Sequence, residues 1–158
     1  MTQFFTQNSG IILRLVTAIV LGMVIGVERV LVHKEAGMKT HALVSMGSAL
    51  FVIISEYLAL RYAGLGAFNP ALIPANIIVG IGFLTAGSII LQNSQLKGLT
   101  TAGGLWVTAG VGIAAGFGLF SLAIISTVLV LIIFIIVNTI EKPIRKISDF
   151  EEKKLNNK

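Results

Sequence analysis

The stretch LGMVIGVERVLVHKEAGMKTHALVSMGSAL, residues 21–50, decides the fold. An apolar segment that carries Gly22 and Gly26 runs into an island of five charged residues between Glu28 and Lys39, and a second apolar segment leaves it. Charged residues are sparse in the stretch that follows, residues 42–140, where they are Glu56, Arg61 and Lys97. Because long apolar segments flank it, the charged island marks a polar site at the edge of a membrane.

The composition predicts an integral membrane protein. The 158-residue chain is 55% hydrophobic and 12% charged, with a mean hydropathy of +0.92. A soluble domain of this size needs a polar exterior, which this composition does not supply. The apolar blocks are long enough to cross a hydrocarbon core of about 30 Å, which takes about 20 helical residues. A transmembrane barrel would instead need alternating segments of about ten residues.

We therefore predict an all-α membrane protein, a compact bundle of about five transmembrane helices. The helices are expected near residues 10–27, 42–61, 74–91, 100–117 and 119–140. Residues 1–141 form the transmembrane domain, and residues 142–158 form a short charged cytoplasmic tail that begins where Pro143 closes the last helix. The tail is either a short interfacial helix on anionic lipid or a solvated segment. Arg14 interrupts the first apolar block, and no basic region precedes it, so we expect a retained helix rather than a cleaved signal peptide.

The distribution of basic residues predicts the orientation in the membrane. With five helices, one side carries Arg29, Lys34, Lys39, Lys97 and the six basic residues of the tail. The other side carries Arg61, which gives the positive-inside pattern. The N-terminus is therefore expected outside and the C-terminus in the cytoplasm. The net charge of +5 then reflects topology, so we expect the lipid bilayer as a partner and no nucleic acid.

The content of small residues predicts which helices lie at the centre of the bundle and which at its periphery. Residues 100–117 are rich in glycine and alanine, which lets neighbouring backbones approach closely, so this helix is expected at the centre of the bundle. Residues 119–140 are bulky and branched, which suits contact with lipid at the periphery. The glycines expected to pack helices together are Gly22, Gly26, Gly80, Gly82, Gly87, Gly112 and Gly116.

Apparent motifs of enzymes and cofactor sites in this sequence lack the residues or the structural setting that those sites require. The run VGIGFLTAG, residues 79–87, has Thr85 at the third glycine position of a nucleotide loop and lies inside an apolar helix. His33 and His41 miss the spacing of a helical zinc site, and no nucleophile motif surrounds the nearby serines. The chain has no cysteine, so there is neither a disulfide nor a thiolate site. We expect no enzyme, no metal site and no cofactor.

Arg14 is the most costly residue to bury, at about 3 kcal/mol or more near a bilayer centre unless it pairs or snorkels. It precedes Glu28 by fourteen positions, and Glu56 follows His41 by fifteen. Arg14 and Glu56 therefore lie at similar depth in antiparallel helices. An intramembrane ion pair would offset much of their desolvation. The alternative is that both side chains snorkel to the outer headgroups.

The charged island has two interpretations. Its basic residues hold the loop in the cytoplasm and contact anionic headgroups, and Thr40 is placed to cap the second helix. Topology does not require Glu28, which could instead pair with a loop cation or receive a basic group of a partner. The candidate functional residues are Glu28, Arg29, Lys39 and Thr40.

Three blocks in unbroken order resemble the membrane domain of the MgtC/SapB family. They are LGMVIGVER with EAGMKTHALVSMGSALF, then NIIVGIGFLTAGSII, then KGLTTAGGLWVTAGVGIAAGFG. The resemblance spans about residues 10–120, and its signature includes Gly37, Gly98, Thr100, Thr101 and Trp106. Three positions depart from the family pattern: Lys39 and Leu72 stand where arginine is usual, and Thr85 where glycine is usual.

The resemblance implies a multi-pass protein of the bacterial cytoplasmic (inner) membrane. It also implies links to magnesium limitation and virulence, control of complexes such as ATP synthase, and no established enzyme activity. Many relatives continue into a soluble regulatory domain, so we expect this chain to represent the membrane domain alone.

Three functional hypotheses follow. The first is a small regulatory protein that contacts a larger transport or ATP-synthase-type complex through its glycine faces and Glu28. The second is a cation channel or transporter subunit, for Mg²⁺ among others, in which Glu28, Asn76 and Thr85 line a path between protomers. The membrane interior offers few acidic groups for a divalent site. The third is a structural homo-oligomer without a client.

Overall fold

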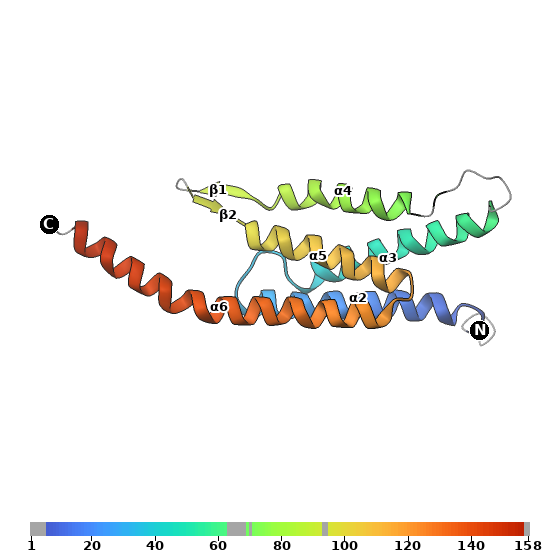
Figure 1. Cartoon of the computed structure of the whole chain (residues 1–158), viewed down its shortest axis with the longest axis horizontal. Helices are drawn as coiled ribbons and strands as arrows, with labels where there is room; N and C mark the ends of the chain where they lie inside the picture. Colours follow the sequence, from blue (N-terminus) through green and yellow to red (C-terminus); the bar gives the residue numbers. More distant parts are fainter. Residues whose placement is uncertain (1–5, 63–68, 70, 93–94, 157–158) are drawn as a thin grey trace.

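The computed structural model describes residues 6–62, 69, 71–92 and 95–156, with side chains up to residue 141. Its elements in chain order are α2 (Ser9–Leu31), α3 (Met38–Arg61), α4 (Leu72–Ala86), β1 (Ile90–Gln92), β2 (Gln95–Lys97), α5 (Leu99–Gly116) and α6 (Phe120–Asn156) (Figure 1). Helices α2, α3, α5 and residues 120–141 of α6 are long and apolar enough to cross a membrane, whereas α4 is apolar but shorter. The predicted class of a helical, multi-pass membrane protein is confirmed. The orientation of the termini stays a prediction.

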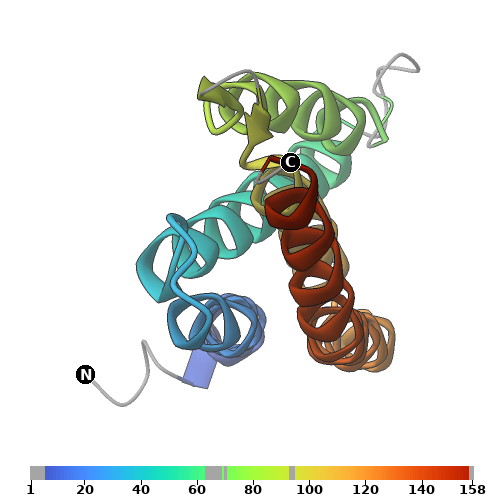
Figure 2. The same ribbon diagram turned by 90° about the vertical axis from the view of Figure 1, so that its left-hand side faces the viewer.

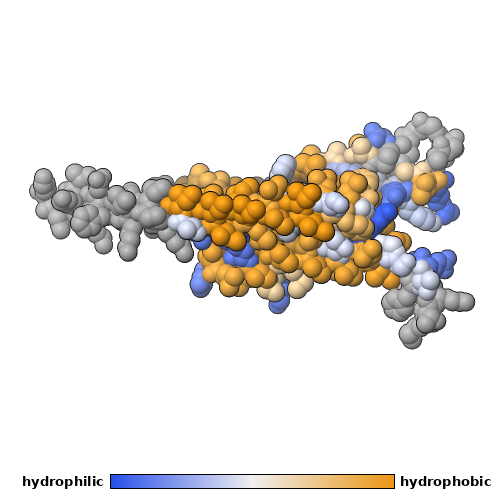
Figure 3. All heavy atoms as spheres, turned by 60° about the horizontal axis from the view of Figure 1, so that its bottom comes forward, coloured by the Kyte–Doolittle hydropathy of each residue, from blue (hydrophilic) through white to orange (hydrophobic). Residues whose placement is uncertain are grey.

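Helix α5 lies at the centre of the bundle, as its small residues predict. It contacts α2, α3, α4 and α6, and 61% of its apolar span is buried, against 17% of the span in α6. Helix α4 lies on one side of α5, and α2 and α6 lie on the other (Figures 1 and 2). Apolar side chains cover most of the bundle surface in view in Figure 3. Such a surface suits contact with lipid chains.

A β-hairpin replaces the end of the helix predicted over residues 74–91. Helix α4 ends at Ala86, and Ser88 stabilises this end: its backbone N–H donates to the Thr85 carbonyl oxygen (3.1 Å), and its hydroxyl donates to the same oxygen (2.7 Å). Strands β1 and β2 then pair antiparallel, with Ile90 opposite Lys97. The sequence did not predict this turn because a short run of isoleucine and leucine suits a strand and a buried helix equally well.

Gly98 joins the hairpin to α5 in a conformation that requires glycine. Its φ of +89° lies in the left-handed region, which residues with a Cβ rarely adopt. A Cβ at this position would also lie 2.9 Å from the Ser88 carbonyl carbon. This glycine therefore lets the chain turn directly from β2 into the first turn of α5.

Two predicted helix boundaries are wrong. Helix α6 does not end at Pro143 but continues to Asn156, so the predicted tail continues the helix up to that residue. A proline removes one backbone donor and bends a helix, and Figure 1 shows α6 bending toward the C-terminus. Thr40 does not cap the second helix, because α3 already begins at Met38 with Gly37 as its N-cap and no side-chain cap bond.

Four of the predicted packing glycines lie at close contacts between backbones. A Cβ at Gly112 would lie 2.8 Å from the Ser45 Cα, and one at Gly22 would lie 2.6 Å from the His41 carbonyl oxygen. Gly26 is similarly close to Met38 and Gly116 to Ala49. These glycines let α2 and α5 pack directly against α3.

The three glycines predicted in the third helix lie differently. A Cβ at Gly80 or Gly82 would meet no atom within 4 Å, and one at Gly87 would contact only carbonyl oxygens of its own helix, at 3.4 Å or more. These three glycines therefore do not pack against another described helix of this chain.

The glycine contacts predict a position-specific effect of one methyl group. Gly112→Ala should destabilise the protein by about 1–3 kcal/mol, because the new methyl overlaps the α3 backbone. Gly110→Ala in the same helix is the matched control: its Cβ would meet open space, and alanine raises helix propensity by up to about 1 kcal/mol. Thermal unfolding in detergent measures both. Equal midpoints would contradict the close packing.

Arg14 joins three helices near the end of α5. Its guanidinium forms an ion pair with Glu56 of α3 and donates to the Gly116 carbonyl oxygen (3.0 Å). That oxygen lies at the C-terminus of α5, where a helix dipole favours a cation. The side chains of Arg14 and Glu56 are 27% and 43% exposed, so the pair lies at the rim of the bundle rather than deep within it.

A double-mutant cycle tests this ion pair. Arg14→Leu and Glu56→Leu should each destabilise the protein, because each leaves one charge unpaired in an apolar setting. The double variant should recover part of the loss, with a coupling of about 0.5–3 kcal/mol in thermal or denaturant unfolding. Arg61→Leu combined with Glu56→Leu serves as the control and should be additive. Additivity for Arg14 as well would mean that the two side chains do not interact.

Candidate functional site

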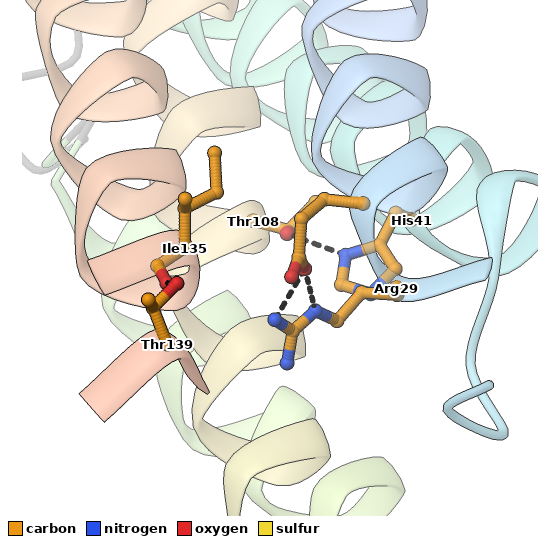
Figure 4. A network of polar contacts seen from close by, with 6 residues as sticks. Arg29, His41, Thr108, Ile135 and Thr139 are labelled. Carbon is orange, nitrogen blue, oxygen red and sulfur yellow. Dashed lines mark hydrogen bonds and ion pairs between the residues drawn. The ribbon is translucent and has the colours of Figure 1, made fainter. Parts of the chain in front are cut away.

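A cluster of buried polar side chains lies where α2, α3 and α5 meet. We call Glu28, Arg29, His41, Ser45 and Thr108 the buried polar cluster. Figure 4 shows Arg29, His41 and Thr108 of this cluster. The first two come from the last turns of α2, the next two from the first turns of α3, and Thr108 from the middle of α5. Polar side chains in an apolar bundle are costly unless they are paired, so this cluster is the strongest candidate for function.

Glu28 and Arg29 form an ion pair between neighbouring residues of α2. Both Nε and Nη2 of Arg29 bond to Glu28 Oε2, and the two residues are 8% and 2% exposed. The Arg29 guanidinium also lies over the ring of Phe134 in α6, 3.4 Å from the ring centroid. This is a cation–π contact. An otherwise lipid-facing helix thus contributes an aromatic ring to the cluster.

His41 links α3 to α5 through Thr108. The imidazole is fully buried, and its Nδ1 lies 2.8 Å from Thr108 Oγ1. The same hydroxyl donates to the Gly104 carbonyl oxygen at 2.8 Å. Because a threonine hydroxyl has one hydrogen, Thr108 can donate to only one of these two partners at a time.

Two buried atoms of the cluster have no hydrogen-bond partner among the described residues. They are His41 Nε2 and the Ser45 hydroxyl oxygen. Buried polar atoms are normally bonded, and an unmet one costs about 1–3 kcal/mol. One imidazole nitrogen and one hydroxyl are too few to hold a metal ion. The described residues contain no group of three or more histidine, cysteine or acidic side chains that could do so.

The structure separates the four candidate residues of the charged island. Glu28 and Arg29 are buried together, whereas Lys39 and Thr40 are exposed on the first turn of α3. The residues of the resembled family signature lie at element ends and on the surface. Gly37 is the N-cap of α3 and Gly98 that of α5, Thr100 and Thr101 lie in the first turn of α5, and Trp106 is exposed.

No sequence pattern assigned His41, Ser45, Thr108 or Phe134 to a functional site. A signal was present in α3, where His41, Ser45, Ser48 and Ser55 recur at intervals of three, four or seven and share one buried face. Phe134 gives no such signal, because a phenylalanine among isoleucines in α6 resembles any lipid-facing residue.

The bond between His41 and Thr108 predicts unequal effects at two similar threonines. Thr108→Val should destabilise the protein by about 1–3 kcal/mol, because it leaves His41 Nδ1 without a partner. Thr127→Val is the matched control. Thr127 is similarly buried, and its hydroxyl bonds the carbonyl four residues earlier at the same 2.8 Å, but it has no interhelical partner among the described residues. Thermal unfolding in detergent compares them, and equal losses would contradict a stabilising interhelical bond.

Comparisons with known proteins match most of the chain. The MgtC family model matches residues 15–143. The putative magnesium transporter YhiD of Escherichia coli strain K12 is 42% identical over 127 residues, which cover 77% of this chain and 58% of that protein. The protein MgtC of Brucella abortus strain 2308 is 38% identical over 134 residues, covering 85% of this chain and 52% of that protein.

A third relative is the uncharacterized protein slr0014 of Synechocystis, which is 43% identical over 121 residues, or 77% of this chain and 49% of that protein. The chain thus spans about half the length of the curated relatives that it matches. No solved structure matches it. Since the family model covers residues 15–143, which is most of the chain, the protein belongs to the MgtC family.

Proposed function

We propose that the protein is a regulatory membrane protein. It binds laterally to a larger complex of the transport or ATP-synthase type in the bacterial cytoplasmic membrane, and it modulates that complex when magnesium is limiting. This role needs no catalysed reaction and no cofactor. The proposal rests on one observation: the two carboxylates within α2 and α3 are both in ion pairs.

Both of these carboxylates are engaged by arginines. Glu28 pairs with Arg29 and Glu56 with Arg14. A divalent cation site in a membrane needs several oxygen ligands of negative or partial negative charge. A carboxylate already neutralised by a guanidinium is a poor ligand for such an ion. The described bundle therefore favours contact with a partner over passage of a cation.

Helix α4 supplies the surface for lateral contact. It contacts α3 and α5 but leaves Val79 75% and Phe83 84% exposed. Gly80 and Gly82 face open space, and Gly80 lines an apolar groove of about 540 Å³ between α3 and α4. A small-residue face beside a groove admits a second helix closely. The sequence-based idea that Glu28 contacts the partner does not fit, because Glu28 is buried within this chain.

The alternative is a cation channel or transporter subunit. The name of the Escherichia coli relative, putative magnesium transporter, favours it. The three residues expected to line its path are apart in this chain. Glu28 is in the buried polar cluster, Asn76 lines the α3–α4 groove, and the Thr85 hydroxyl donates to the Gly82 carbonyl oxygen (3.0 Å). A path through them would need contributions from further protomers.

Leucine substitutions on α4 test the regulatory proposal. Gly80→Leu with Gly82→Leu should remove a stoichiometric partner from affinity purifications in mild detergent from magnesium-limited cells. The thermal midpoint should not fall, because both side chains enter open space and leucine has a higher helix propensity than glycine. Gly110→Leu, an equally open position on α5, is the control and should retain the partner.

Liposomes that contain the purified protein address the alternative directly. No Mg²⁺ flux is expected. Flux without any partner, lost in a folded Glu28→Gln variant, would overturn the regulatory proposal and establish the transporter.

A further inference from the structure

A polar cavity lies outside the buried polar cluster, between the loop after α2 and the start of α5. Its volume is about 460 Å³. One wall consists of His33, Lys34 and Glu35, and the other consists of residues 95–101, which include β2 and the first turn of α5. The cavity thus brings together two segments that are far apart in the sequence. The first segment follows the candidate membrane span that ends at Leu31, and the second leads into the span that begins at Leu99.

The first turn of α5 presents hydrogen-bond donors to this cavity. The first backbone N–H groups of a helix have no acceptor within the helix, and the N-cap residue, Gly98, supplies no side-chain acceptor. The N–H groups of Leu99, Thr100 and Thr101 therefore lack a helical acceptor, and all three residues line the cavity. The positive end of the dipole of this 18-residue helix lies at the same place.

Thr101 gives a second, independent indication of a ligand. It is 3% exposed and lines the cavity, yet its hydroxyl makes no hydrogen bond to any described residue. The buried threonines Thr108 and Thr127 behave differently, since each hydroxyl bonds the carbonyl four residues earlier. The hydroxyl of a buried threonine that lines a polar cavity and has no partner among the described residues is available to a bound molecule.

The charges on the cavity wall favour an anion. Lys34 and Lys97 come from opposite walls, and neither forms an ion pair among the described residues; the Lys97 ammonium donates to Gln92 Oε1 at 2.7 Å. His33, held at φ +57°, lines the same wall as Lys34. Glu35 opposes the two lysines with one negative charge. Two ammonium groups, a helix N-terminus and a hydroxyl together match the oxygens and charge of a phosphate group.

We propose that this cavity binds a phosphate group. The Lys34 and Lys97 ammonium groups would contact its oxygens, while the first N–H groups of α5 and the Thr101 hydroxyl would donate to them. The group belongs either to a free phosphate compound or to the headgroup of an anionic phospholipid, since the cavity lies where the membrane spans end. This site is distinct from the α4 surface, and its existence does not depend on the proposed regulatory function.

Binding to the purified full-length protein tests the site. The probes are inorganic phosphate in detergent, measured by calorimetry, and nanodiscs with or without phosphatidylglycerol, measured by retained lipid in native mass spectrometry. Thr101→Val, Lys34→Gln and Lys97→Gln should each weaken binding about tenfold or more, the size expected for losing a hydrogen bond to a charged group. Thr127→Val and Lys39→Gln are the matched controls and should bind like the parent protein.

The two probes separate the sources of the phosphate. Saturable binding of inorganic phosphate that the cavity variants weaken indicates a free phosphate ligand. Retention of phosphatidylglycerol alone, again weakened by the cavity variants, indicates a lipid headgroup. Because Lys34 and Lys97 are exposed, their variants keep the test valid if Thr101→Val does not fold. No binding of either probe, or equal losses in Lys39→Gln, would overturn the proposal.

Discussion

The close approach of α2 and α5 to α3 is the constraint on which the rest of the structure depends. Gly22 and Gly112 face the α3 backbone at His41 and Ser45 from two neighbouring helices. A hydrogen bond between heavy atoms tolerates only about 0.5 Å of variation in length. A side chain at either glycine would separate the helices by more than that, and His41 would then no longer reach Thr108. The glycines therefore determine whether a polar cluster exists between these helices at all.

Low dielectric imposes a second constraint, which divides the charged island into two parts. Glu28 and Arg29 enter the bundle as a neutral pair covered by Phe134, because either charge alone would be costly to bury. Lys34 and Lys39 stay exposed, where water solvates them or lipid headgroups contact them. An island that appears continuous in the sequence thus has a buried half that stabilises helix packing and an exposed half that is free to meet ligands.

The sequence predicted features that depend on one helix at a time. Apolar length predicts the spans, the density of small residues predicts the central position of α5, and depth along antiparallel helices brings Arg14 near Glu56. Features that depend on how one helix is rotated against another were not predicted. The bond from His41 to Thr108, the ring of Phe134 over Arg29 and the open faces of Gly80 and Gly82 all depend on that rotation. Periodicity shows which residues share a face, but not which neighbour that face meets.

The phosphate cavity and the buried polar cluster share α5, and the loop that forms the other wall of the cavity follows directly after α2. This limits how independently the two sites can behave. Thr101 and Thr108 lie seven residues apart on the buried face of α5, about 10 Å along one rigid helix. The other wall of the cavity, formed by the loop after α2, is joined to the cluster as directly, because the Lys34 N–H donates to the Arg29 carbonyl oxygen (2.9 Å). A ligand held between Lys34 and the start of α5 would therefore act on the segments that position Arg29 and Thr108. Its effect on the bundle is limited to the difference in its affinity for alternative arrangements of those segments.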